Sequence, residues 1–222
     1  MTKRFKNRTD AGVQLADKLK RYKDATNTII LALPRGGVPV AYQVAKNLNL
    51  PMDLFIVRKL GFPGQEEYAM GAIAGNEVCV FNTQALILGN VKPEEVQSVI
   101  DNETKELVRR NELYRKGRPM PNLHTKKVIL VDDGIATGSS IKAALLALEK
   151  FQPKEITLAV PVLPENSIKE LEPLTNALIY LDAPKMFFSV GNWYEDFTQV
   201  SDNEVIQLLA QANMIQERRL GR

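Results

Sequence analysis

The sequence is poor in the residue types that form disulfides, metal clusters or membrane spans. Its 222 residues include one cysteine, Cys79, and one histidine, His124. A single cysteine excludes an internal disulfide, and the two residues cannot supply the ligands of a structural zinc site. The longest apolar runs, such as residues 128–131, fall far short of the ~20 residues that a membrane helix needs. We therefore expect a cytoplasmic protein without a membrane partner, whose fold is stabilised by its apolar core.

The charge of the chain is unevenly distributed along the sequence. The net charge is +3, but residues 1–23 carry +6, residues 217–222 carry +2 and the chain between them carries −5. Basic ends can attract nucleic acid or anionic ligands. A solvated terminal helix is the simpler interpretation, and we expect no nucleic-acid partner. With 45% hydrophobic and 25% charged residues, the chain has the composition of an ordinary globular domain, which excludes intrinsic disorder.

Strand and helix patterns alternate along most of the chain. Buried strands are expected at 28–33, 53–58, 127–131, 155–160 and 177–181, and helices at 10–22, 38–48, 93–116, 139–150, 165–172 and 202–215. This alternation predicts an α/β fold with a parallel sheet covered by helices on both faces. Two apolar stretches, 70–74 and 78–81, flank Gly75-Asn76 and predict a hairpin. The long helix at 93–116 is mostly charged, and one stripe of it holds Val96, Ile100, Glu103, Leu107 and Tyr114.

The strongest chemical signal is the segment 128–140, VILVDDGIATGSS. A buried strand delivers Asp132 and Asp133 to its carboxyl end, where the ligands of parallel sheets bind. Adjacent carboxylates point to opposite faces if the strand geometry persists, and together they can hold hydroxyls or a metal ion. The loop that follows opens a helix, whose free amides and positive dipole end favour a phosphate. An ordinary capped strand-to-helix turn is the alternative, but two acids after an apolar strand are costly without partners.

With this segment the chain resembles the type I phosphoribosyltransferases, and most closely a bacterial group of unassigned substrate. The acidic pair followed by a small-residue loop is similar to that family's signature for 5-phosphoribosyl 1-pyrophosphate (PRPP). Three further stretches support the resemblance in order: 33–39 (LPRGGVP), 57–61 (VRKLG) with 69–72 (AMGA), and 190–197 (VGNWYEDF). The resemblance implies one domain over residues 1–222, with an insertion at 61–118 that contains a hairpin, a flexible loop and a long helix, and a small hood at 182–200.

The resemblance also implies the activity: transfer of ribose 5-phosphate from PRPP to a nitrogen acceptor, with release of pyrophosphate and with Mg²⁺ as cofactor. Arg35, Asp132 and Asp133 are the expected catalytic residues, and the carboxylates contact the metal only through PRPP or water. The expected PRPP- and phosphate-binding residues are Arg35, Gly36, Gly37, Arg58, Lys59, Asp132, Asp133, Gly134, Ile135, Ala136, Thr137, Gly138, Ser139 and Ser140. For Arg58 and Lys59, a role in capping the sheet is an equal alternative.

The resemblance gives three expectations of geometry. The peptide bond Pro34–Arg35 in the pyrophosphate loop is cis or can become so. A mobile lid covers the reacting centre with residues 61–68. Trp193 or Tyr194 lines the cleft that contains Asp133 and Arg35 and stacks on a nucleobase-like acceptor; burial under the terminal helix is the alternative for Trp193. We also expect a homodimer.

One departure from the family bears on the acceptor. Enzymes of the wider family that use 6-oxopurines carry an aspartate where this chain has Ala136, so 6-oxopurines are disfavoured. A non-catalytic protein that senses PRPP or a nucleotide is the alternative function, although Arg35, which such a sensor could lose, is present. The chain has neither a GxxxxGK[S/T] nor a GxGxxG motif, which argues against P-loop and dinucleotide chemistry.

Overall fold

The computed structural model describes residues 4–75, 78–82, 86, 89 and 91–219 of the chain. Its main sheet has the strand order β2-β1-β6-β7-β8, and every neighbouring pair is parallel. These strands are β1 (Thr28–Ala32), β2 (Met52–Leu54), β6 (Lys127–Val131), β7 (Glu155–Val162) and β8 (Ala177–Asp182). The α/β fold with a parallel sheet is confirmed. Among the described residues, no helix is both long and apolar enough to cross a membrane.

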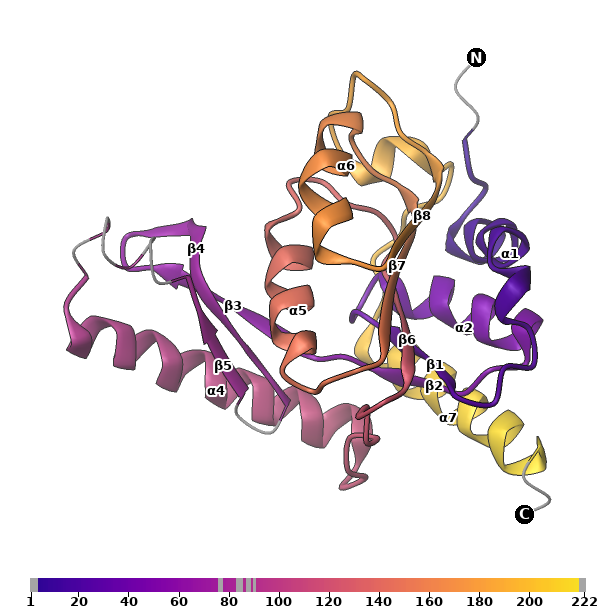
Figure 1. Ribbon diagram of the computed structural model, residues 1–222, viewed down its shortest axis with the longest axis horizontal. Helices are drawn as coiled ribbons and strands as arrows, with labels where there is room; N and C mark the ends of the chain where they lie inside the picture. The colour runs from indigo at the N-terminus through magenta and orange to yellow at the C-terminus, as the bar shows by residue number, and fades with distance from the viewer. Residues whose placement is uncertain (1–3, 76–77, 83–85, 87–88, 90, 220–222) are drawn as a thin grey trace.

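Helices cover both faces of the main sheet (Figure 1). One face carries α1 (Arg8–Lys18), α2 (Gly37–Leu48) and α7 (Asp202–Arg219), and the other carries α5 (Ser139–Glu149) and α6 (Glu165–Leu171). Successive residues of β1 alternate between the two cores because strand side chains alternate in direction: Ile30 packs in the first core, and Ile29 and Leu31 pack in the second. All five residues of β1 are buried, which explains its uninterrupted apolar sequence.

The pairing of β1 with β6 brings two loops together. In their register Ala32 lies opposite Val131, so both strands end at the same edge of the sheet. The amide of Leu33 then donates to the carbonyl of Val131 over 3.0 Å. The loop 34–37 and the acidic pair 132–133 therefore leave the sheet side by side.

A second sheet and a long helix extend from the main body (Figure 1). Strands β3 (Val57–Phe62), β4 (Gln65–Ala74) and β5 (Val78–Phe81) form an antiparallel sheet. It packs between α5 and α4 (Pro93–Arg115). The hairpin expected from 70–74 and 78–81 is confirmed as β4–β5; the structure describes Gly75, but Asn76 lies outside the described residues.

One expectation for this region is wrong. The strand expected at 53–58 is divided between the sheets: the amide of Phe55 still bonds to Ala32 of β1, and the chain then crosses into β3. Residues 61–68, expected to act as a mobile lid, form the end of β3, a turn and the start of β4; their movement over the site stays a prediction. Gly64 occupies the turn with a φ of +75°, which glycine adopts without steric cost. The glycines at 61 and 64 therefore shape a hairpin in this structure, not an open loop.

The end of α4 is fixed to the main sheet by a buried ion pair. Arg115 is 5% exposed, and its Nη1 donates to Asp53 over 2.7 Å while Nη2 donates to the carbonyl of Leu54 over 2.5 Å. Burial lowers the pKa of the Arg115 guanidinium and raises the pKa of the Asp53 carboxyl. Each charge is therefore tolerated chiefly because the other is present.

Replacing Arg115 by Met is expected to lower the free energy of unfolding by roughly 3–5 kcal/mol, because Asp53 is left buried without its charged partner. Urea unfolding measures this loss. The double variant Arg115→Met/Asp53→Leu should recover part of it. Arg109→Met removes an exposed arginine of the same helix that is paired with Glu106, and it should leave stability nearly unchanged. Equal stabilities of Arg115→Met and Arg109→Met would contradict the prediction.

Candidate functional site

The centre of the site is the acidic pair that follows β6. The amide of Asp133 donates to the side chain of Asp132 over 2.8 Å, which fixes the turn at the end of the strand. Burial, and then the charge of Asp133, raises the pKa of Asp132 well above its usual range. Burial also raises the pKa of Asp133, and the nearby Arg8 guanidinium opposes this shift. The two carboxylates thus form a desolvated anionic centre whose charge needs cations or hydroxyl donors.

The loop 34–37 lies directly against this pair. Its peptide bond Pro34–Arg35 is cis, as expected. A Cβ atom placed on Gly36 would lie 2.1 Å from Oδ2 of Asp133, and one on Gly37 would lie 2.8 Å from the carbonyl oxygen of Val131. Only glycine allows so close an approach. The two sequence motifs therefore build one surface.

Arg35 of this loop points toward the start of α7. Its Nη1 lies 3.7 Å from Oδ1 of Asp202, and both side chains are more than a third exposed. The hydroxyl of Tyr114 donates to the same Asp202 oxygen over 2.6 Å, and burial with this carboxylate neighbour raises the pKa of Tyr114 to about 12. Since the Arg35 pair is long and solvated, it holds the guanidinium weakly, and an arriving anion can recruit it.

The expected phosphate loop, residues 134–140, connects the acidic pair to α5. Gly138 precedes the helix with a left-handed φ of +76°. The amide of buried Ile135 bonds to Val162 over 2.9 Å, whereas Ala136, Thr137 and Ser140 are exposed. The sheet thus holds one end of the loop and leaves the other open to solvent at the start of a helix. This is the arrangement that suits a phosphate group.

A cavity of about 560 Å³ opens beside these loops. Its walls come from the ends of the main strands, from β3 and its turn, and from α4. The lining residues are Leu33, Pro34, Phe55, Ile56, Val57, Arg58, Lys59, Gly61, Phe62, Pro63, Gly64, Val99, Asn102, Glu103, Arg110, Asp132 and Ser140. Each predicted motif except the hood thus contributes a residue to it, and a substrate-sized ligand fits its volume.

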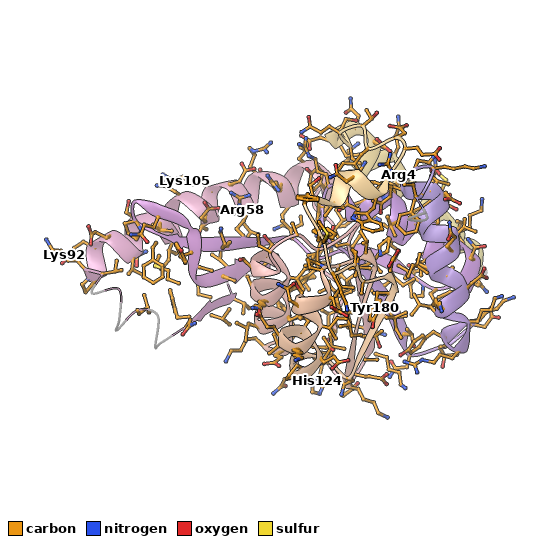
Figure 2. The ribbon with its side chains drawn as sticks, turned by 90° about the horizontal axis from the view of Figure 1, so that it is seen from above. Arg4, Arg58, Lys92, Lys105, His124 and Tyr180 are labelled. Carbon is orange, nitrogen blue, oxygen red and sulfur yellow. The ribbon has the colours of Figure 1, made fainter. Side chains whose placement is uncertain are left out.

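Arg58 meets α4 inside this cavity. Its Nε donates to Glu103 over 2.6 Å, and both side chains are about a quarter to a third exposed. Figure 2 shows Arg58 beside the helix. Arg58 and Lys59, the adjacent pair expected from the sequence, therefore both line the cavity, and both are cationic.

The structure buries Trp193 and does not bring its ring to this cavity. Trp193 is 6% exposed and stacks on Phe187 at a ring-centroid distance of 6.3 Å. Tyr194 is 4% exposed and packs between Phe5 and Phe197. Neither ring is among the described residues that line the cavity. Large aromatic rings bury well at the junction of two chain segments, and here the hood closes over the N-terminal segment.

Tyr194 does reach the acidic pair by its polar end. Its hydroxyl donates to the backbone carbonyl of Asp133 over 2.5 Å, and burial strongly raises its pKa, so it remains a neutral donor. Its hydroxyl thus holds the backbone of Asp133, and its buried ring presents no exposed face on which an acceptor could stack. Its expected role in acceptor binding therefore stays a prediction without a ring surface to support it here.

Two contributions to the site are not predicted by the sequence. Arg8 donates to Asp133 from α1, although the basic N-terminal segment has the composition of a solvated helix. Glu103, Asn102 and Arg110 bring α4 into the cavity wall. The one available signal is Glu103, a carboxylate within the apolar stripe of that helix.

Comparison with known proteins agrees with this geometry. The sequence model of the phosphoribosyl transferase domain matches residues 3–195. Two proteins from strains of Mycobacterium tuberculosis, each named "Putative phosphoribosyl transferase", are 39% identical over 211 residues. The match covers 95% of this chain and 47% of theirs, so the chain spans about half the length of these curated relatives. The crystal structure of TT1426 from Thermus thermophilus is 35% identical, with a TM-score of 0.85 over 94% of this chain and 98% of that one.

Proposed function

Because the chain belongs to the phosphoribosyltransferase domain family, we propose that it transfers ribose 5-phosphate from PRPP to a nitrogen acceptor and releases pyrophosphate. The observation that carries the proposal is the contact between the two loops: Gly36 leaves room for the Asp133 carboxylate. This contact joins an anion-binding loop to a hydroxyl-binding pair at one strand edge. PRPP likewise carries its diphosphate next to two ribose hydroxyls, so the neighbouring groups of the ligand match the two neighbouring loops.

Each part of PRPP has a matching group on the chain. The open amides and hydroxyls of residues 136–140 receive the 5′-phosphate at the start of α5. Asp132 and Asp133 accept hydrogen bonds from the ribose hydroxyls. Arg35 and the amides of the glycine loop receive the diphosphate, with Arg58 and Lys59 on the cavity wall behind it.

The reaction needs little from the protein beyond positioning and electrostatics. Positive charge develops on the ribose ring as the bond to pyrophosphate lengthens, and the Asp132–Asp133 pair, bound to the ribose hydroxyls, stabilises that charge. Negative charge develops on the leaving pyrophosphate, and Arg35 neutralises it. The acceptor nitrogen then forms its bond to C1 of the ribose as the bond between C1 and pyrophosphate breaks, and the proton of the acceptor N–H passes to the leaving pyrophosphate or to water.

The donor set also fits Mg²⁺. Two carboxylates provide hard oxygen ligands, and the described residues include no cluster of three or more His, Cys, Asp or Glu side chains that could enclose a metal by itself. Mg²⁺ commonly combines one or two carboxylates with substrate phosphates and waters. Bound with PRPP, it would supply positive charge to the diphosphate, with Asp132 and Asp133 contacting it through PRPP or water.

The acceptor is proposed to be a nucleobase-like ring, with 6-oxopurines disfavoured by Ala136. We further propose that the enzyme works in the cytoplasm as a homodimer and as one domain over residues 1–222. The apolar residues of the cavity, such as Val57, Phe62 and Val99, offer a surface for a planar ring.

Incubation with PRPP, Mg²⁺ and a panel of nucleobases is expected to release pyrophosphate with at least one acceptor, and with none when Mg²⁺ is chelated. A coupled pyrophosphate assay measures this release. Tight binding of PRPP without turnover on any acceptor would favour the alternative, a protein that senses PRPP. Absence of PRPP binding by calorimetry would reject both.

A further inference from the structure

Arg8 makes an interaction that none of the assigned roles explains. Its Nε donates to Oδ2 of Asp133 over 2.7 Å, although the residues are 125 positions apart. Both side chains are largely buried, at 11% and 13% exposure. A charge-assisted hydrogen bond that is shielded from water in this way is stronger than a surface ion pair. The contact thus places an N-terminal side chain on the acid that is proposed to bind ribose.

The backbone around Arg8 is held on both sides. Before it, the amide of Phe5 donates to Trp193 over 2.8 Å, and the amides of Glu195 and Asp196 donate to Phe5 and Lys6. After it, α1 begins, capped by Asn7, whose side chain accepts from the amide of Asp10 over 2.9 Å. The first residue of α1 is therefore fixed relative to the hood.

Close packing of helices fixes α1 against the main body as well. A Cβ atom on Gly12 would lie 2.6 Å from the carbonyl oxygen of Val40 in α2, so the two helices touch at this glycine. α2 begins at Gly37, within the glycine loop 34–37. Packing against α2 therefore ties Arg8 to this loop, and its hydrogen bond ties it to the acidic pair at 132–133.

The guanidinium itself is also held in place. Nη1 donates to the carbonyl of Thr198 over 2.8 Å, and the guanidinium carbon lies 3.8 Å from the centre of the Phe197 ring. The planar fork of arginine makes these contacts together with the one to Asp133; a lysine ammonium cannot. Arg8 therefore joins the hood, through residues 197–198, to the acidic pair.

We propose that Arg8 is a positioning residue for ribose recognition, an inference that rests on the proposed function. Arg8 binds Oδ2 of Asp133 and so fixes the orientation in which the carboxylate meets the incoming ribose hydroxyl. Tyr194 holds the backbone of the same residue from the other side. The carboxylate is then oriented before PRPP arrives, which reduces the ordering that binding requires.

The inference is tested by calorimetry with two ligands, PRPP and inorganic pyrophosphate, each with Mg²⁺. Pyrophosphate lacks the ribose hydroxyls that Asp133 is proposed to bind, and Asp133 reaches it only indirectly, through Mg²⁺ and water. Arg8→Met is expected to weaken PRPP binding roughly tenfold or more and to leave pyrophosphate binding unchanged. Arg8→Lys keeps the charge but loses the fork, and its PRPP affinity should fall between those of Arg8→Met and wild type. Arg4→Met, which removes an exposed arginine nearby (Figure 2), serves as the control for net charge.

The outcomes separate three cases. Selective loss of PRPP affinity in Arg8→Met, with partial rescue by Arg8→Lys, supports the inference. Equal losses for PRPP and pyrophosphate, or unchanged PRPP affinity, would overturn it while the proposed function stands. If the wild-type protein binds no PRPP, the proposed function fails and the role of Arg8 fails with it.

Discussion

Changing both Asp132 and Asp133 to Asn is expected to lower PRPP affinity about 100-fold or more, because two charged acceptors of hydrogen bonds are lost together. The fold should survive, since the carboxamide oxygen introduced at position 132 can still accept the backbone amide of position 133, which Asp132 accepts over 2.8 Å. Calorimetry with PRPP and Mg²⁺ measures the affinity, and circular dichroism checks the fold. Asp17→Asn, which removes an acid with a 66% exposed side chain on α1, is the matched control. Unchanged PRPP affinity in the double variant would refute the assignment.

The single variant Asp132→Asn has a predicted effect on stability as well. Burial and Asp133 raise the pKa of Asp132 above its value in the unfolded chain. A raised pKa means that the folded state binds the proton more tightly, so wild-type stability falls as the pH rises from the unfolded pKa through the folded one. The carboxamide of the variant does not ionise. Its advantage in melting temperature over wild type should therefore grow with pH across this interval, while its PRPP affinity falls by less than that of the double variant.

Much of the fold could be predicted from local pattern alone. Strand β6 begins and ends at residues 127 and 131, as predicted, because it contains the apolar run 128–131 and a buried parallel strand must be apolar on both faces. The two proposed ligand loops could be predicted for the same reason: each follows such a strand, and parallel strands end at one edge. Their direct contact then follows from the pairing of β1 with β6.

The error at residues 53–58 concerns a place where tertiary contacts override the local pattern. Residues 53–58 read as one strand, but the hydrogen bond from Phe55 to Ala32 and the pairing of Val57 with Ala74 assign its halves to different sheets. Glycine-rich residues 61–68 suggest a mobile lid; in the structure a register shift and a left-handed Gly64 fold them into a hairpin, and the movement of this hairpin stays a prediction. For residues 53–58 the pairing partners lie far away in the sequence, whereas the hairpin pairs residues a few positions apart, such as Phe62 with Gln65.

Contacts between residues that are far apart in the sequence are what the sequence reveals least. Arg8 belongs to a basic segment whose composition suits a solvated helix, and nothing at spacings of three or four residues indicates a contact with Asp133. Trp193 differs from its expected environment in the opposite direction. The polar residues close to it in the sequence favour a position in the cleft, but its ring packs on Phe187. For such residues the chemistry depends on which distant segment the fold places beside them.

The direct contact between the two proposed ligand loops can be tested at Gly36. Its backbone is right-handed helical, with φ −59° and ψ −35°, so the backbone itself tolerates alanine. The added Cβ would lie 2.1 Å from Oδ2 and 2.6 Å from Cγ of Asp133, far inside van der Waals contact. Either the loop or the carboxylate must move.

Gly36→Ala is therefore expected to lower kcat/KM for PRPP by about 100-fold, since a displacement of about 1 Å in a positioning group has an effect of this size. Stability should fall by only about 1–3 kcal/mol, as for other overpacked sites. Gly75→Ala is the matched control, because its Cβ would meet only the flexible Met120 side chain at 3.2 Å. Steady-state kinetics and urea unfolding measure the two effects. If Gly36→Ala kept wild-type kcat/KM, the Asp133 carboxylate would not lie against this loop in the working enzyme, and the surface proposed to bind PRPP would have to be rebuilt from other residues.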